Sequence, residues 1–284
     1  MSHSENVNNL TADEIREAVR DNYGKVAERD GEGGCCGTST GCGTGSACCA
    51  PGEETEITVD AISAALGYSP EELAGAPDGA NLGLGCGNPQ AIASLKPGET
   101  VLDLGSGAGF DSFLAARTVG PEGTVIGVDM TPQMIKKARE NARKVELNNV
   151  VFRLGEIENI PVADNTVDAI ISNCVINLSP EKEQVFREAF RVLRGGGRLA
   201  ISDVVATADL PTKVRENLSL YTGCVGGAAP IGEITEMLSR AGFTNIAIKP
   251  KDESREFIRE WVPGSNLSDY ITSATIEAIK PVAN

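Results

Sequence analysis

The residues of this chain best suited to chemistry are its eight cysteines, because thiolates bind soft, thiophilic centres. Five of them fall within fifteen residues in the spacing CC-x5-C-x5-CC, and they are Cys35, Cys36, Cys42, Cys48 and Cys49. This spacing lacks the C-x2-4-C pairs of zinc sites and the cysteine runs of ferredoxins. Adjacent thiols can still hold a soft centre. The alternative is a redox-sensitive loop with no fixed task.

The other three cysteines stand alone among small residues, and they are Cys86, Cys174 and Cys224. An isolated cysteine is usually a small buried hydrophobic residue. Cys174, however, follows an expected strand over residues 168–172, and ligands of a doubly wound sheet bind beyond the carboxyl ends of its strands. Three thiolates that converge at this edge would form a trigonal site for a three-coordinate soft atom.

Composition excludes several other kinds of chemistry. The single histidine, His3, lies in a polar leader, which argues against histidine acid–base catalysis and histidine-rich metal sites. A net charge of −15 repels phosphate backbones and anionic lipid, so no nucleic-acid or membrane partner is expected. No apolar run approaches the roughly 18 residues of a spanning helix, and the N-terminus does not resemble a signal peptide. We therefore expect a cytoplasmic protein with reduced thiols.

A glycine-rich turn predicts a binding site for an adenosine-containing ligand. The turn supplies Asp103, Gly105, Gly107 and Gly109. Glycines here let the backbone approach a ligand at the positive end of the following helix. Asp129 lies twenty residues past Gly109 at the end of the next strand, where its carboxylate can accept hydrogen bonds from both ribose hydroxyls. The alternative is a tight strand–helix turn beside a solvated aspartate.

The elements that must position these residues alternate between strand and helix. Strands are expected over residues 100–104, 124–129, 150–154, 168–172 and 198–203. Helices are expected over residues 110–118, from Thr131-Pro132, and from Ser179-Pro180 to the glycines at 195–197. This alternation predicts an α/β fold with right-handed crossovers and a doubly wound, mostly parallel sheet covered on both faces.

Two further regions flank this core, which we place at residues 79–205. Residues 1–78 are expected to hold helices, one opened by a capping box at Thr11 and one by Ser69-Pro70, around a Gly- and Cys-rich loop at 31–50. Residues 206–284 are expected to form a smaller α+β region for the substrate. Its expected elements are helices over 211–220 and 231–240 and a strand over 245–249.

The glycine turn reads G-x-G-x-G, not the dinucleotide pattern G-x-G-x-x-G, and so resembles motif I of class I S-adenosylmethionine-dependent methyltransferases. The segments 155–157, 165–173 and 191–197 are similar to later motifs of these enzymes. The resemblance covers roughly residues 95–205 and implies a Rossmann-like methyltransferase fold. It also implies that S-adenosylmethionine contacts Asp103, Gly105, Gly107, Gly109, Asp129, Met130, Glu156, Ile157 and Asn173.

Longer stretches resemble one family, the arsenite S-adenosylmethionine methyltransferases. They are residues 16–24, 85–89, 103–111, 172–178, 221–228 and 261–265. The resemblance implies that Cys86, Cys174 and Cys224 bind trivalent arsenic as arsenite or methylarsenite. It also implies that one of the N-terminal cysteines, with Cys35 and Cys36 as candidates, has a redox role. Thioredoxin or glutathione is then expected to reduce the disulfides that form.

This chemistry needs no base. Trivalent arsenic bound by three thiolates keeps a lone pair that can attack the methyl group of a sulfonium in line. Catalysis is then mostly the positioning of two partners, together with deprotonated thiols. Two rival functions are a methyltransferase for a small organic molecule such as a quinone and a non-catalytic, thiol-rich metalloid binder or sensor.

Overall fold

The computed structural model describes residues 6–28, 58–261 and 266–282 of the chain. His3, the loop expected at 31–50 and its five cysteines, Cys35, Cys36, Cys42, Cys48 and Cys49, lie outside the described residues. No helix in the described ranges is both long and apolar enough to cross a membrane.

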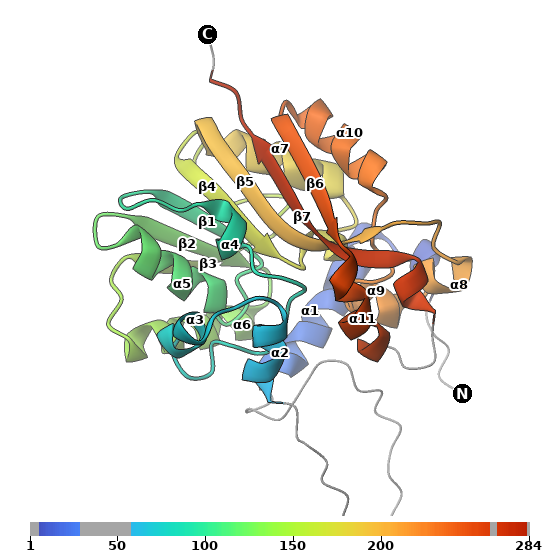
Figure 1. Cartoon of the computed structure of the whole chain (residues 1–284), viewed down its shortest axis with the longest axis horizontal. Helices are drawn as coiled ribbons and strands as arrows, with labels where there is room; N and C mark the ends of the chain where they lie inside the picture. The colour runs from blue at the N-terminus through green and yellow to red at the C-terminus, as the bar shows by residue number, and fades with distance from the viewer. Residues whose placement is uncertain (1–5, 29–57, 262–265, 283–284) are drawn as a thin grey trace, which may run out of the picture.

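The described residues build a seven-stranded sheet with the order β3-β2-β1-β4-β5-β7-β6 (Figure 1). The strands are β1 (Thr100–Leu104), β2 (Thr124–Asp129), β3 (Val150–Leu154), β4 (Val167–Asn173), β5 (Leu193–Ala206), β6 (Thr244–Lys251) and β7 (Ile271–Ile279). The first five pair in parallel, whereas β7 runs antiparallel to both of its neighbours, β5 and β6. The prediction of a doubly wound, mostly parallel sheet is confirmed.

Helices cover both faces of this sheet. They are α1 (Ala12–Glu28), α2 (Val59–Ala65), α3 (Pro70–Gly75), α4 (Gln90–Ala93), α5 (Phe110–Val119), α6 (Pro132–Lys144), α7 (Lys182–Val192), α8 (Thr212–Arg215), α9 (Leu218–Thr222), α10 (Ile231–Ala241) and α11 (Arg255–Trp261). Residues of α7 and α10 belong to one apolar core, and residues of α4, α5 and α6 belong to another. The central strands β1, β2 and β4 are buried on both faces and are mostly apolar with little alternation, whereas the edge strands β3 and β6 are partly exposed.

Local signals set several helix starts. The Thr11 N–H donates to the Glu14 carboxylate at 2.7 Å, and the Glu14 N–H donates back to the Thr11 hydroxyl at 3.3 Å. Ser69 and Glu72 form the same reciprocal pair at the start of α3, where Pro70 occupies the first turn. The capping box expected at Thr11 and the helix start expected at Ser69-Pro70 are both confirmed.

Three expected elements differ in the structure. Helix α7 begins at Lys182 and not at Pro180. The Ser179 hydroxyl donates to Glu158 and accepts a hydrogen bond from the Glu181 N–H, so it does not cap a helix that starts at Pro180. The glycines at 195–197 do not follow the helix as a stop but lie inside β5. The helix expected over 211–220 is divided into α8 and α9, because Asn217 leaves the helical conformation and caps α9.

Strand β7 was not predicted. Its sequence, ITSATIEAI, is rich in Thr, Ser and Ala, and its residues are buried on both sides of the sheet. A strand covered on both faces shows no alternation of polar and apolar residues, so periodicity gives no signal. Together with β6 it extends the same sheet that holds the glycine turn.

Candidate active site

A cavity of about 480 Å³ lies at the carboxyl ends of β1, β2 and β4. Its lining includes nine of the residues predicted for cofactor or thiol chemistry, which are Asp103, Gly105, Gly107, Asp129, Met130, Ile157, Asn173, Cys174 and Cys224. Gly109, Glu156 and Cys86 are not among the lining residues. The glycine turn and two of the thiols therefore share one cavity.

The glycine turn requires glycine for different reasons at different positions. At Gly105 (φ 69°) a Cβ atom would lie 2.5 Å from the Val175 side chain. At Gly107 (φ 52°) the space around the Cα atom is open, so only the left-handed backbone conformation favours glycine there. The turn therefore brings bare backbone to the cavity at Gly107. Gly109 serves packing instead, because a Cβ there would lie 2.7 Å from the Phe113 ring.

Asp129 links the turn to the next strand. Its two carboxylate oxygens accept the Gly107 N–H at 2.9 Å and the Thr131 N–H at 2.8 Å. Burial raises the pKa of Asp129, and these two backbone hydrogen bonds oppose the shift. Each oxygen keeps a free lone pair, so the half-buried carboxylate can still accept hydroxyl donors from a ligand.

Asp103 mainly joins two elements of the fold, whereas Asp129 faces the cavity. It is buried, and the Ser112 hydroxyl donates to it at 2.6 Å, which ties β1 to α5. Burial and the charge of Asp111 hold the pKa of Asp103 well above its usual range. One of its oxygens accepts the Ser112 hydroxyl, while the residue also contributes to the cavity wall.

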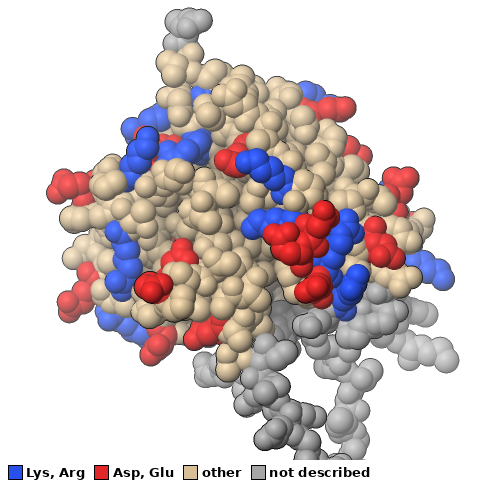
Figure 2. Space-filling view, in the orientation of Figure 1, with Lys and Arg blue, Asp and Glu red and all other residues tan. Residues whose placement is uncertain are grey.

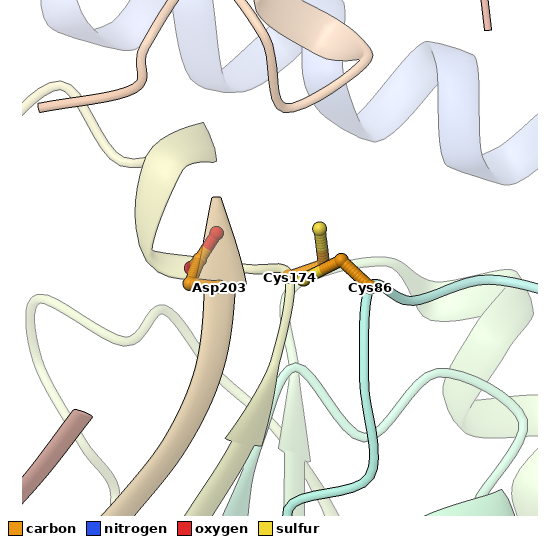
Figure 3. A group of neighbouring side chains, drawn as sticks. All are labelled: Cys86, Cys174 and Asp203. Atoms are coloured by element: carbon orange, nitrogen blue, oxygen red, sulfur yellow. The ribbon is translucent and has the colours of Figure 1, made fainter. Parts of the chain in front are cut away.

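The thiols of Cys86 and Cys174 and the Asp203 carboxylate lie within 4.8 Å of one another (Figure 3). Cys174 follows β4, Asp203 belongs to β5, and Cys86 belongs to the loop between α3 and α4. The Cys224 thiol donates to the Cys174 carbonyl oxygen at 2.8 Å. The structure thus brings together three thiols that are far apart in sequence.

Two of these cysteines have an uncommon backbone. Cys174 (φ 58°) and Cys224 (φ 64°) both adopt the left-handed conformation. For a residue with a Cβ atom this conformation costs about 1–3 kcal/mol, and such residues cluster at functional sites. The strain indicates that the surrounding packing holds both thiols in place.

The pKa values of two of these thiols, Cys86 and Cys174, are raised. Burial is the main cause that raises the pKa of Cys86, and the nearby Asp203 carboxylate adds to it. The pKa of Cys174 is raised well above its usual range by hydrogen bonds with Cys224 and Cys86 and by burial. A soft centre that takes the place of the thiol protons would bind these sulfurs without leaving buried, unpaired thiolate charge.

Helix α1 covers one side of the cavity. Its buried Arg16 pairs with Glu158 at 3.3 Å and also contacts Glu181, and both Arg16 and Glu158 line the cavity. Glu156 instead lies outside the lining, where it pairs with Arg16 at 4.0 Å and with Arg20 at 3.9 Å. Of these two carboxylates, only Glu158 lines the cavity.

Sequence reasoning missed four polar residues at the site, which are Arg16, Asp111, Glu158 and Asp203. A signal existed for Asp203, because it ends the apolar run expected as a strand over residues 198–203, although β5 continues past it to Ala206. Asp203 is buried and accepts the N–H groups of Ile176 and Val204. Burial raises its pKa to about 6.

Comparisons with known proteins agree with this geometry. Residues 95–242 match the family model "Methyltransferase domain". Over 95% of its length the chain is 54% identical to the arsenite methyltransferase of Halobacterium salinarum, of which it covers 67%. Over 50% of its length it is 38% identical to the human arsenite methyltransferase, of which it covers 40%. The chain thus spans about two thirds of the first relative and less than half of the second.

A solved structure is also similar. It is CrArsM, an arsenic(III) S-adenosylmethionine methyltransferase from Chlamydomonas reinhardtii, with a TM-score of 0.59 and 35% sequence identity. The match covers 78% of this chain and 73% of that one.

Proposed function

This chain belongs to the arsenite methyltransferase family, within the class I S-adenosylmethionine-dependent methyltransferases, and from that membership we propose that it methylates trivalent arsenic held by Cys86, Cys174 and Cys224. One observation carries the proposal. Three thiols meet at the end of β4, beside a cavity whose other wall is the glycine turn. The product class is methylated arsenicals, which makes the role arsenic detoxification.

The cavity fits S-adenosylmethionine. The buried Ser106 hydroxyl lines it and has no hydrogen-bond partner among the described residues, so it can bind a polar group of a ligand. Asp129 can hold ribose hydroxyls, and a cationic ligand beside Asp103 would favour the ionised form of that buried carboxyl group. When bound, the donor supplies an electrophilic methyl group on a positively charged sulfur.

The thiols load arsenic by a balanced exchange. Three S–H groups replace the three hydroxyls of arsenite, which leave with the protons as three water molecules. Arsenic keeps its lone pair after this exchange, so no side chain has to act as a base. The residues that hold arsenic therefore act by orientation, which can lower the barrier substantially when two bound partners react.

Helix α1 acts by excluding water. Val19 and Tyr23 line the cavity, and both belong to an apolar cluster with Cys174 and Cys224. The Tyr23 hydroxyl lies 3.9 Å from the Cys224 sulfur. A dry wall beside the thiols protects both a sulfonium and an arsenic–sulfur bond from hydrolysis.

The cycle needs a thiol reductant, for which we propose thioredoxin or glutathione. The new arsenic–carbon bond uses the arsenic lone pair and leaves arsenic pentavalent. Two thiolates that release the methylated product then give it two electrons, which returns arsenic to the trivalent state, and the two sulfurs pair as a disulfide that the external thiol reduces. Cys35 and Cys36 are the candidates for an additional exchange partner. Free thiols at the site suit a reducing compartment such as the cytoplasm.

The test is methyl transfer to arsenite by the purified chain, with Cys174→Ser and Cys224→Ser beside it. Each variant is expected to lose at least a hundredfold in rate while its affinity for S-adenosylmethionine, measured by calorimetry, changes less than twofold. Full activity in either variant contradicts the three-thiol site.

The same assay separates the rival functions. Methylation of a quinone ring that survives both cysteine replacements would instead identify a methyltransferase for organic substrates. Tight arsenite binding without any methylated product would identify a metalloid binder or sensor.

A further inference from the structure

The side-chain amide of Asn173 forms hydrogen bonds with the main chain of the loop that carries Cys86. Its Oδ1 atom accepts the Cys86 N–H at 3.0 Å, and its Nδ2 atom donates to the Gly87 carbonyl oxygen at 2.7 Å. One amide thus binds both sides of the loop that carries the first thiol. Because the next residue is Cys174, the same amide joins that loop to the second thiol.

Two buried side chains hold this amide in one orientation. Its Nδ2 atom also donates to the Tyr68 hydroxyl at 3.0 Å, and that hydroxyl donates to Asp111 at 2.8 Å. A reversed amide would set its NH2 group against the Cys86 N–H and its oxygen against the Gly87 carbonyl. Only asparagine in this orientation satisfies both sides of the loop.

The loop approaches Asn173 closely. Gly85 has φ 141°, and a Cβ atom there would lie 2.9 Å from the Asn173 amide. On the other side, the Ser273 hydroxyl of β7 donates to the Cys86 carbonyl oxygen at 2.5 Å. The main chain of Cys86 is therefore tethered through its N–H to β4 and through its carbonyl to β7.

We propose that Asn173 is a positioning residue that determines which arsenical the site accepts, because its amide holds the Cys86 loop against Cys174. This inference rests on the proposed function. Arsenite has three exchangeable hydroxyls and takes three thiols, whereas methylarsenite has two and can be held by Cys174 and Cys224 alone. Loss of the tether should therefore affect the first methyl transfer and spare the second.

The experiment compares Asn173→Ala with the wild type on arsenite and on methylarsenite. We expect kcat/KM for arsenite to fall at least tenfold and kcat/KM for methylarsenite to stay within twofold. Cys86→Ser should reproduce this pattern, and Asn148→Ala, at an exposed asparagine, should change neither value. Equal losses on the two substrates in Asn173→Ala would overturn the proposal.

The geometry of bound arsenic gives a second test, which does not depend on enzymatic turnover. X-ray absorption of arsenite-loaded protein should show three sulfur neighbours per arsenic in the wild type and two in Asn173→Ala. Three sulfurs in the variant would overturn the proposal. So would a tenfold loss of S-adenosylmethionine affinity, because Asn173 would then act at the donor. If the wild type neither binds nor methylates arsenite, the proposed function itself fails.

A second variant covers the case in which Asn173→Ala does not fold. Ser273→Ala removes the tether on the opposite side of Cys86 and keeps the hydrogen bond from the Ser273 N–H to Ser254. It should shift the ratio of arsenite to methylarsenite activity in the same direction, at least threefold. An unchanged ratio in a folded Ser273→Ala protein would contradict the role of the tethers.

Discussion

The thiols of the site are suited to exchanging their protons for a soft atom, and not to attacking carbon as nucleophiles. Burial raises the pKa of Cys86, and hydrogen bonds with the other two thiols raise that of Cys174. A catalytic cysteine that attacks carbon needs the opposite shift, toward a thiolate at neutral pH. Protonated, crowded thiols suit a soft atom that takes the place of their protons.

This shift predicts how loading depends on pH. Below a raised pKa the thiolate fraction increases about tenfold per pH unit, so arsenite binding should accelerate from pH 7 to pH 9 with a slope approaching that limit. Stopped-flow absorbance of the arsenic–sulfur bonds measures the rate. Cys86→Ser lacks one of the titrating thiols and should show a shallower dependence, whereas a wild-type rate that is constant across this range would contradict the raised pKa values.

Among the elements, α1 shows the limit of what local sequence reveals. Its capping box and apolar stripe were predicted from neighbouring residues, but its place over the cavity was not, because Arg16 meets its partners only in the folded chain. Those partners, Glu158 and Glu181, are more than a hundred residues away. The side chains of Arg16 and Glu158 are 8% and 7% exposed, so water solvates neither charge well.

Arg16→Met tests this contact. The variant leaves Glu158 buried without its ion pair, which should lower the free energy of unfolding by about 3–5 kcal/mol. It should also weaken S-adenosylmethionine binding, because α1 lines the cavity. Urea denaturation and calorimetry measure the two effects.

The matched control is Arg20→Met on the same helix. Arg20 is 39% exposed and lies 3.9 Å from Glu156, so its loss should cost less than about 1 kcal/mol. Equal effects of the two replacements would mean that the contact of Arg16 with Glu158 does not hold the helix.

The strands also show which features local sequence predicts and which depend on distant contacts. Glycines and apolar runs predicted β1, β2 and β3 with their observed bounds, and the topology of a doubly wound sheet predicted that Cys174 lies at the edge where ligands bind. Cys86 and Cys224 lie in loops whose course depends on packing, so only resemblance to a family suggested them. Asn173 was expected at the cofactor, but its hydrogen bonds run to the Cys86 loop, an arrangement that no local pattern encodes.

At the scale of the whole molecule, acidic residues outnumber basic ones by 40 to 25. On the face shown in Figure 2 both kinds lie interspersed, and several neighbouring pairs are of opposite sign. The charge of −15 nevertheless makes the folded state repel itself over longer distances. Such repulsion is screened when the Debye length falls from about 10 Å at 0.1 M salt to about 3 Å at 1 M.

The folded protein should therefore gain stability from salt. We expect the midpoint of thermal unfolding to rise by several degrees between 0.1 M and 1 M sodium chloride, as measured by circular dichroism. Potassium chloride at equal ionic strength should give the same increase, because screening does not depend on the cation. A midpoint that falls with salt would show that ion pairs such as Arg198–Glu99 outweigh the overall repulsion.

The position of β7 also affects how the protein is made. This strand follows both of its partners in sequence and is synthesised after them, yet it lies between β6 and β5 in the sheet. Until it emerges, β5 has an unpaired edge and the Cys86 carbonyl has no Ser273 to bind. A growing or prematurely ended chain thus carries the thiols without the frame that brings them together. If the proposed function holds, the three-thiol site for arsenic forms only after β7 has been synthesised and has paired with β5.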